Sequence, residues 1–284
     1  MIPTALSIAG SDPSGGAGIQ ADLKAFSARG VYGMAAVTAL TAQNTTGVAA
    51  VHALPPDFVA SQIAEVLVDV RVGAVKVGMI ANAGIARAVA GALDGLPMPV
   101  VVDPVMVARG GAALLEDSAV EAVREALLPR AGLITPNLPE AARLLDAPVA
   151  TSRDAIQVQA TALLSLGPRA VLIKGGHLGG DDSPDLLVHD DDATWIEGRR
   201  VATANTHGTG CSLSSAVAAE LAKRRPLTQA VRTAKTWLDG ALAGADGLGV
   251  GQGHGPVHHF HALWPVPGDA PEGRPRAPEQ GDPT

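Results

Sequence analysis

Short, mostly apolar segments alternate with segments of helical periodicity along this chain, and no other feature constrains its fold as strongly. The apolar segments cover residues 5–9, 34–40, 74–79, 100–102, 133–135 and 170–173. Strands that lack polar alternation are buried on both faces, as in parallel sheets whose strands are connected by helices. The alternation therefore predicts an α/β fold, a mainly parallel central sheet with helices on both faces.

The remaining segments complete the expected architecture. Helical spacing begins at Ile19, and further helices are predicted at 55–70, 85–93, 120–128, up to 145 after the turn at 136–140, and at 155–166, 212–223 and 227–243. The acidic, turn-rich segment 183–201 predicts a surface hairpin. Residues 265–284 are rich in proline, glycine and charge, so we expect a disordered tail after a single domain at residues 1–264.

Composition excludes several classes of protein. The net charge is −7 and no basic stretch suits a nucleic-acid backbone, so no nucleic-acid partner is expected. The N-terminus has no basic leader, and no apolar segment is long enough to predict a membrane span. The single cysteine cannot form an internal disulfide, which fits a reducing compartment, and we expect the cytoplasm.

The loop Asn205-Thr206-His207-Gly208-Thr209-Gly210-Cys211 leads directly into an alanine-rich helical segment. The first N–H groups of a helix have no intrahelical partner, and the helix dipole adds positive potential there. A phosphate is the natural occupant of such a site. We therefore expect phosphoryl transfer here, with N–H groups of Gly208, Thr209, Gly210 and Cys211 as donors. An ordinary glycine-rich helix entry is the structural alternative.

Other polar residues follow predicted strand ends. Gly10, Asp103, Asn137 and Lys174 all do so, and strands of a parallel sheet end at the same edge. We therefore expect these residues and the 205–211 loop to lie along one edge of the sheet.

Two nucleotide-binding fingerprints are incomplete. Residues 16–21 fit the loose glycine pattern of dinucleotide-binding folds, but no acidic residue lies between Asp22 and Asp57 to hold a ribose. The Gly-Lys-Ser/Thr tripeptide of the Walker A motif is absent. A nicotinamide-dependent enzyme and a P-loop kinase are both disfavoured.

Six motifs in this order resemble the bacterial hydroxymethylpyrimidine/phosphomethylpyrimidine kinases of thiamine biosynthesis. They are SIAGSDPSGGAGIQAD (7–22), TALTAQNT (38–45), TPNLPEA (135–141), KGGH (174–177), NTHGTGC (205–211) and GPVHHFH (255–261). The resemblance runs from about residue 4 to 264 and implies a ribokinase-like three-layer sandwich, a homodimer, and two successive phosphorylations with ATP and Mg²⁺. Arg109, where the family often has lysine, and the tail after Trp264 depart from the family pattern.

For the pyrimidine substrate, Gln43 can present a donor and an acceptor side by side, which complements the edge of an aminopyrimidine. The resemblance implies the same contact, although a loop-capping amide is the alternative. Asp22 is expected to hold a substrate amino or hydroxyl group, or only to favour its helix start. Gly10 and Ala17 would give close backbone approach to the ring, and Met79 would pack on it or belong only to the core.

Cys211 is expected to be the base that takes the proton of the substrate hydroxymethyl group, because a helix start can lower a thiol pKa towards neutrality. A small buried apolar residue is the alternative.

Lys174 suits ATP phosphates, or is a surface lysine. Asp103 suits Mg²⁺. Asn137 and Glu140 resemble the family's metal and phosphate motif, and their spacing equally fits a helix capping box.

Two alternative functions remain open. A pyridoxine or pyridoxal kinase would share the fold, although a vitamin B6 ring lacks the edge that Gln43 matches. A non-catalytic ligand sensor would not need Cys211, Lys174, Asp103 and Glu140 together.

The histidines at 254, 258, 259 and 261 lack a standard zinc spacing and are expected to order the C-terminal segment.

Overall fold

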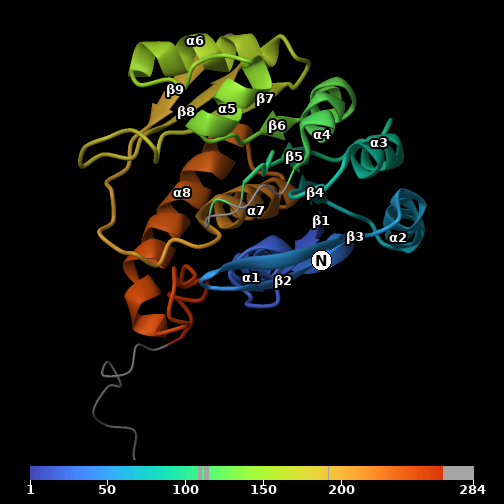
Figure 1. Ribbon diagram of the computed structural model, residues 1–284, viewed down its shortest axis with the longest axis horizontal. Helices are drawn as coiled ribbons and strands as arrows, with labels where there is room; N and C mark the ends of the chain where they lie inside the picture. The colour runs from blue at the N-terminus through green and yellow to red at the C-terminus, as the bar shows by residue number, and fades with distance from the viewer. Residues whose placement is uncertain (108–110, 112–114, 191, 265–284) are drawn as a thin grey trace, which may run out of the picture.

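The computed structural model describes residues 1–264 except 108–110, 112–114 and 191, and it has one nine-stranded sheet (Figure 1). The strand order is β3-β2-β1-β4-β5-β6-β7-β8-β9. The strands are β1 (Thr4–Ser11), β2 (Tyr32–Asn44), β3 (Gly47–Ala53), β4 (Ala74–Val77), β5 (Val100–Val102), β6 (Leu133–Ile134), β7 (Ala170–Lys174), β8 (Asp185–His189) and β9 (Asp192–Ile196). Arg109 and the tail at 265–284 lie outside the described residues.

The sheet is parallel in its centre and antiparallel at both edges. From β2 through β1, β4, β5 and β6 to β7, each pair of neighbours is parallel. β3 pairs antiparallel with β2, and β8 and β9 extend the other edge as an antiparallel hairpin. The hairpin was predicted, but its strand β8 is buried, because it pairs on both sides. Strand β3 was not predicted.

Helices cover both faces of the sheet, as Figure 1 shows. One face carries α2 (Pro56–Asp69), α3 (Ala83–Ala92), α4 (Asp117–Ala122), α5 (Leu138–Leu145) and α6 (Arg153–Leu164). The other carries α1 (Gly18–Ala28), α7 (Thr209–Ala222) and α8 (Leu227–Ala243). On β5, Val100 and Val102 belong to the first core and Val101 to the second. Because successive side chains of a strand point to opposite faces, a continuously apolar strand supplies both cores.

Several helix starts follow from local sequence. The side chain of Asn82 accepts the N–H of Ile85 at the start of α3, and Ser152 accepts the N–H of Ala155 at the start of α6. Helix α7 has no such side-chain cap and begins after Gly208, whose φ is +74°. Its first turn therefore leaves backbone N–H groups without an internal acceptor.

Among the described residues, no helix combines the length and the apolar character that crossing a membrane would require.

Candidate active site

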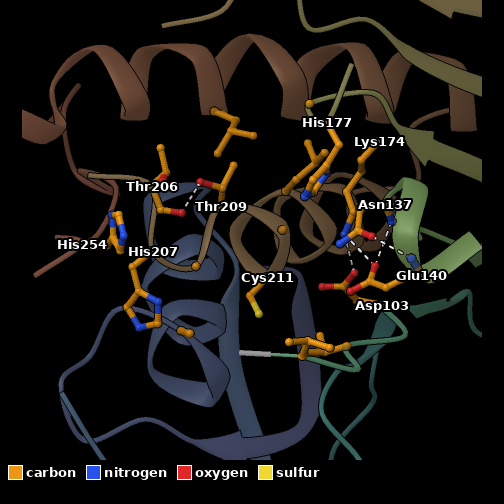
Figure 2. Close-up of a pocket in the computed structure, with 18 of the residues that line it drawn as sticks. Asp103, Asn137, Glu140, Lys174, His177, Thr206, His207, Thr209, Cys211 and His254 are labelled. Carbon is orange, nitrogen blue, oxygen red and sulfur yellow. Dashed lines mark hydrogen bonds and ion pairs between the residues drawn. The ribbon is translucent and has the colours of Figure 1, made fainter. Parts of the chain in front are cut away.

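A cavity of about 830 Å³ lies where the parallel strands end, as the strand ends in the sequence predicted. Its wall combines the glycine loop after β1, the end of β2, the segment after β5, and the starts of α5 and α7. Figure 2 shows Cys211 between His207 on one side and Asp103 and Glu140 on the other. Segments from the beginning, middle and end of the chain thus share one wall.

The start of α7 is packed against the glycine loop. A Cβ atom at Gly208 would overlap the carbonyl oxygen of Gly16, so only glycine fits there, and the positive φ favours glycine as well. The Thr209 hydroxyl donates to the Thr206 carbonyl oxygen at 2.7 Å. Gly208, Thr209, Gly210 and Cys211 all line the cavity. The position of Gly208, Gly210 and Cys211 fits the predicted donors to a phosphoryl group, whereas the Thr209 N–H already donates to the Thr206 carbonyl oxygen at 3.3 Å.

Three buried charges lie beside this helix start. Lys174 Nζ is 2.7 Å from Asp103 Oδ1 and 3.9 Å from Glu140 Oε2. A Cβ atom at Gly210 would lie 3.0 Å from Lys174 Nζ, so the ammonium group is close to the first turn of α7. The Thr135 hydroxyl donates to Asp103 Oδ1 at 3.1 Å, and the Ser214 hydroxyl lies 3.3 Å from Asp103 Oδ2. A cation therefore lies at the cavity wall with two carboxylates around it.

The charges perturb one another. Burial raises the pKa of Glu140 to about 7, with Asp103 acting in the same direction and Lys174 opposing it. Burial would also raise the pKa of Asp103, but Lys174 and Lys76 hold it below its ordinary value. The pKa of Lys174 is raised, because Asp103 and Glu140 outweigh its own burial. At neutral pH the cluster therefore holds an anionic Asp103, a cationic Lys174 and a Glu140 close to its own midpoint.

Asn137 and Glu140 form a complete capping box. Glu140 N donates to Asn137 Oδ1 at 2.9 Å, and Asn137 N donates to Glu140 Oε2 at 2.8 Å. The Asn-x-x-Glu spacing therefore does form a helix cap. The cap does not exclude a metal-binding role, because Glu140 has a second carboxylate oxygen. The described residues contain no cluster of three or more His, Cys, Asp or Glu side chains arranged for a metal. Two carboxylates, Asp103 and Glu140, fit Mg²⁺, which keeps waters and takes phosphate oxygens as further ligands.

The opposite end of the cavity is less charged. A Cβ atom at Gly10 would lie 2.8 Å from Met79 Sδ, so the absence of a side chain at Gly10 makes room for Met79. The Thr38 hydroxyl holds the Met79 carbonyl oxygen at 2.7 Å. Gly10, Ala17, Gln43 and Met79 all line the cavity. The structure thus brings together four of the five residues predicted to bind substrate.

Asp22 is the exception, because its position does not allow the expected contact with substrate. It is fully buried and does not belong to the cavity wall. Its two carboxylate oxygens accept from Lys76 Nζ, both at 2.9 Å, and from the hydroxyls of Ser7 and Ser215. A carboxylate one turn into α1, buried between the helix and the sheet, meets the lysine on β4 before it can reach the cavity.

Lys76 is a functional candidate that the sequence reasoning missed. Its side chain is fully buried on β4, yet it contributes to the cavity wall. Burial lowers the pKa of Lys76, but Asp22, Cys211 and Asp103 together raise it above the ordinary value. One feature of the sequence could have identified Lys76, because it is the one lysine within an otherwise apolar strand. A lysine is almost never buried unless it is paired, so a buried partner was to be expected.

Asp12 and His207 were also missed, and they connect the two loops of the site. His207 Nε2 lies 2.8 Å from Asp12 Oδ2, and Asp12 Oδ2 also accepts from the N–H groups of Gly16 and Ala17. Burial opposes ionisation of Asp12, but His207, Ser14 and the Ala17 N–H hold its pKa below the ordinary value. The Asp12 carboxylate therefore shapes the glycine loop around His207.

The expected low pKa of Cys211 is wrong for this structure. Burial raises the pKa of the thiol to about 11, and the Lys76 ammonium opposes that rise less strongly. Asp103 and Asp22 add to the rise because they are negative. A helix start alone therefore does not make this thiol acidic when two buried carboxylates lie nearby.

The C-terminal histidines pack against α7 and α8. His259 Nε2 lies 2.9 Å from the Ser212 hydroxyl, and burial lowers its pKa to about 3, so it is neutral. His261 occupies the space beside Gly240 on α8. These contacts agree with an ordering role for the segment.

Comparisons with known proteins give the family. The phosphomethylpyrimidine kinase family matches residues 12–258. The hydroxymethylpyrimidine/phosphomethylpyrimidine kinase of Salmonella typhimurium is 54% identical over 261 residues, which are 92% of this chain and 98% of that one. The Escherichia coli protein of the same name is 53% identical, with the same coverage of both chains.

Solved structures agree on the fold. The phosphomethylpyrimidine kinase of Clostridium difficile superposes with a TM-score of 0.74 at 40% identity, covering 83% of this chain and 97% of that one. A pyridoxal kinase of Bacillus subtilis in complex with ADP reaches 0.85 at 36% identity, covering 92% and 99%. The fold is therefore ribokinase-like, as the resemblance implied. Because sequence identity is clearly higher to the pyrimidine kinases, the pyridoxal kinase alternative is disfavoured, and this chain belongs to the hydroxymethylpyrimidine/phosphomethylpyrimidine kinase family of thiamine biosynthesis.

Proposed function

We propose that this cavity transfers the terminal phosphoryl group of ATP to the hydroxymethyl group of 4-amino-5-hydroxymethyl-2-methylpyrimidine, and then to the resulting monophosphate. The observation that carries the proposal is the position of the α7 start. Figure 2 shows Cys211, in the first turn of α7, between His207 on one side and Asp103, Glu140 and Lys174 on the other. The uncharged Gln43 side chain lies beside His207, and Gly10 and Met79 line the same cavity. Phosphoryl transfer depends mainly on positioning and on stabilising charge, and this arrangement supports both.

The charged end would hold the phosphates of the nucleotide. Lys174 supplies a fixed cation next to the first turn of α7, and the N–H groups of Gly208, Thr209, Gly210 and Cys211 supply dipoles. Asp103 and Glu140 would hold Mg²⁺, which neutralises phosphate charge during the transfer when it is bound. Asn137, with its oxygen already engaged by the Glu140 N–H, would act mainly by fixing the position of Glu140.

The uncharged end would hold the pyrimidine. Gln43 would pair with the amino group and ring nitrogen, while Met79 packs on the ring and Gly10 and Ala17 permit close approach of the backbone. The support is that all four residues line the cavity, and that Met79 lies directly beside Gly10. Asp22 would not contact the substrate and would act indirectly, by fixing the position of Lys76.

Cys211 would accept the proton of the alcohol in the first phosphorylation. The thiol must first ionise, and Lys76 is the charge that favours its ionised form. The second acceptor is a phosphate monoester that is already ionised near neutral pH, so it needs no base. The two reactions should therefore depend on Cys211 to different degrees.

We further infer a single domain at residues 1–264 and a homodimer in the cytoplasm. The family resemblance supports the dimer. Light scattering checks the oligomer, and the activity of a chain truncated after Trp264 checks the domain boundary. A monomeric mass, or loss of activity on truncation, would contradict these inferences.

Mass spectrometry of the products tests the main proposal directly. The protein is incubated with the hydroxymethylpyrimidine and Mg-ATP, and in parallel with pyridoxal and Mg-ATP. We expect the pyrimidine monophosphate first and the diphosphate later, with pyridoxal phosphate at most a minor product. Formation of pyridoxal phosphate alone would favour a pyridoxal kinase. The absence of any ADP would favour a non-catalytic ligand sensor.

A further inference from the structure

The Gln43 side chain lies between two polar neighbours that come from distant parts of the chain. Thr41 precedes it by two positions on β2, so both side chains are on the same face of the strand, and a bulge follows Ala42. Thr41 Oγ1 is 3.2 Å from Gln43 Oε1, and His207 Nε2 is 3.4 Å from Gln43 Nε2. Whether each neighbour has a hydrogen to donate decides whether the amide oxygen or the amide NH₂ group of Gln43 can face it.

The Thr41 hydroxyl has only one hydrogen, and a better acceptor takes it. Thr41 Oγ1 is 2.8 Å from the carbonyl oxygen of Ser11, which is an acceptor only, whereas its distance to the Gln43 amide is longer. Once that hydrogen is committed to Ser11, the Thr41 oxygen can only accept. The Gln43 atom beside Thr41 must then be a donor, which is the amide NH₂ group.

The His207 side gives the same answer independently. His207 Nε2 is 2.8 Å from Asp12 Oδ2, an oxygen that already accepts from the N–H groups of Gly16 and Ala17. A carboxylate that accepts several N–H groups is ionised and cannot donate, so His207 Nε2 must carry the hydrogen. That one hydrogen is committed to Asp12, so Nε2 has no lone pair with which to accept an N–H from Gln43, 3.4 Å away. The amide NH₂ group is therefore excluded from the position facing His207, which leaves the amide oxygen.

We propose that Thr41 and His207 are positioning residues that fix the Gln43 amide with its NH₂ group towards Thr41 and its oxygen towards His207. The oxygen and nitrogen of an amide have nearly the same shape, so a half-turn of the group gives Thr41 an N–H to accept and removes the contact between two donors at His207, without any change in packing. The pyrimidine contact itself rests on the proposed function, whereas the orientation rests only on contacts within the chain.

The fixed amide gives the cavity a polarity that a substrate must match. One N–H of Gln43 remains free on the Thr41 side, and one lone pair of its oxygen remains free on the His207 side. The ring nitrogen of an aminopyrimidine should therefore face the Thr41 side, and its amino group the His207 side. A ring with these groups in the reverse order would have to turn the amide away from both of its neighbours.

Nuclear Overhauser effects test the orientation without any substrate. The protein is prepared with ¹⁵N-glutamine and with protonated threonine methyl and histidine ring positions, and the Gln43 amide signal is assigned by its loss in Gln43→Glu. We expect cross-peaks from the amide hydrogens to the Thr41 methyl group and none to the His207 ring. Cross-peaks to the His207 ring without any to Thr41 would overturn the proposal.

Steady-state kinetics test the consequence with a matched pair of variants. Thr41→Val removes the hydroxyl at nearly constant volume, and Thr41→Ser retains it. We expect Thr41→Val to raise the KM for the pyrimidine roughly tenfold with kcat and the KM for ATP within about twofold, and Thr41→Ser to restore the pyrimidine KM. An unchanged pyrimidine KM in Thr41→Val would overturn the positioning role.

Gln43→Glu separates this inference from the proposed function. If Gln43→Glu leaves the pyrimidine KM unchanged, Gln43 does not contact the ring, and that part of the proposed function fails. The Overhauser pattern would still decide the orientation of the amide in that case.

Discussion

The two ends of the cavity are built on different physical principles. At one end, Gly10, Met79 and Gln43 are uncharged, and neighbouring backbone and hydroxyl groups fix their positions. At the other end, Asp103, Glu140 and Lys174 are buried charges that shift one another's pKa. In the proposed function, the first arrangement would discriminate between substrates by shape and hydrogen-bond order, and the second would stabilise charge. Substitutions at the first end should therefore change acceptor binding, and substitutions at the second should change turnover.

Lys174→Met is the strongest test of the charged end. Removing the cation takes away charge stabilisation of the transferred phosphoryl group, so we expect kcat/KM to fall roughly a thousandfold for both phosphorylations. Steady-state kinetics with both acceptors measure the loss. Thermal unfolding must be followed in parallel, because the variant leaves Asp103 buried without its cation. Near-normal turnover in a folded variant would remove Lys174 from the mechanism.

Cys211→Ala tests whether the centre of the cavity supplies a base. We expect kcat/KM for the alcohol to fall about a hundredfold and that for the monophosphate by less than about tenfold. Equal losses in the two reactions would refute the role of Cys211 as a base.

The wild-type pH profile sharpens the same point. Because the pKa of the Cys211 thiol is raised to about 11, its ionised fraction grows about tenfold per pH unit below that value. The kcat/KM for the alcohol should therefore rise between pH 7 and 9 much more steeply than that for the monophosphate, and Cys211→Ala should abolish the difference.

Gln43→Glu tests the uncharged end. The variant loses the amide donor at constant size, so we expect the KM for the pyrimidine to rise roughly 30-fold with little change in the KM for ATP. A comparable rise in both KM values would mean that the two ends of the cavity do not act separately.

Asn137→Ala has the smallest expected effect and separates capping from metal binding. Loss of the cap should lower the free energy of unfolding by about 1 kcal/mol. The Mg²⁺ requirement should rise by less than about tenfold, because Glu140 loses only one of the contacts that fix its position. Ser152→Ala at the start of α6 is the matched control, since Ser152 caps its helix and does not line the cavity. A Mg²⁺ requirement that rises more than about tenfold in Asn137→Ala alone would identify Asn137 as a metal ligand.

Local patterns predicted most of the fold, because buried strands and amphipathic helices leave a signature at short range. Helix α8 has the predicted bounds, and the central strands lie where the apolar segments placed them. Strand β3 was missed because its side chains are mostly exposed, so that pairing with β2, rather than burial, defines it. Strand β2 likewise continues through the polar segment that ends at Asn44.

The sequence also placed most of the candidate site at one edge of the sheet, because strand ends and glycine loops are local features. It could not place Asp22, because the position of that carboxylate depends on a lysine on another strand. It could not give the pKa of Cys211 either, since desolvation and the charges of Lys76, Asp103 and Asp22 arise only in the folded chain. Long-range pairs of buried charges were the main source of error.

The contact between the Gly16 carbonyl and position 208 has a consequence for biosynthesis of the enzyme. His207 and Asp12, on either side of this contact, are 195 positions apart, so the ribosome must complete most of the chain before they can meet. A nascent polypeptide that ends before α7 lacks the helix start that we propose as the phosphate site. Catalytic competence therefore appears late and reports that the first and last segments of the chain have docked, which makes the onset of activity a measure of completed folding.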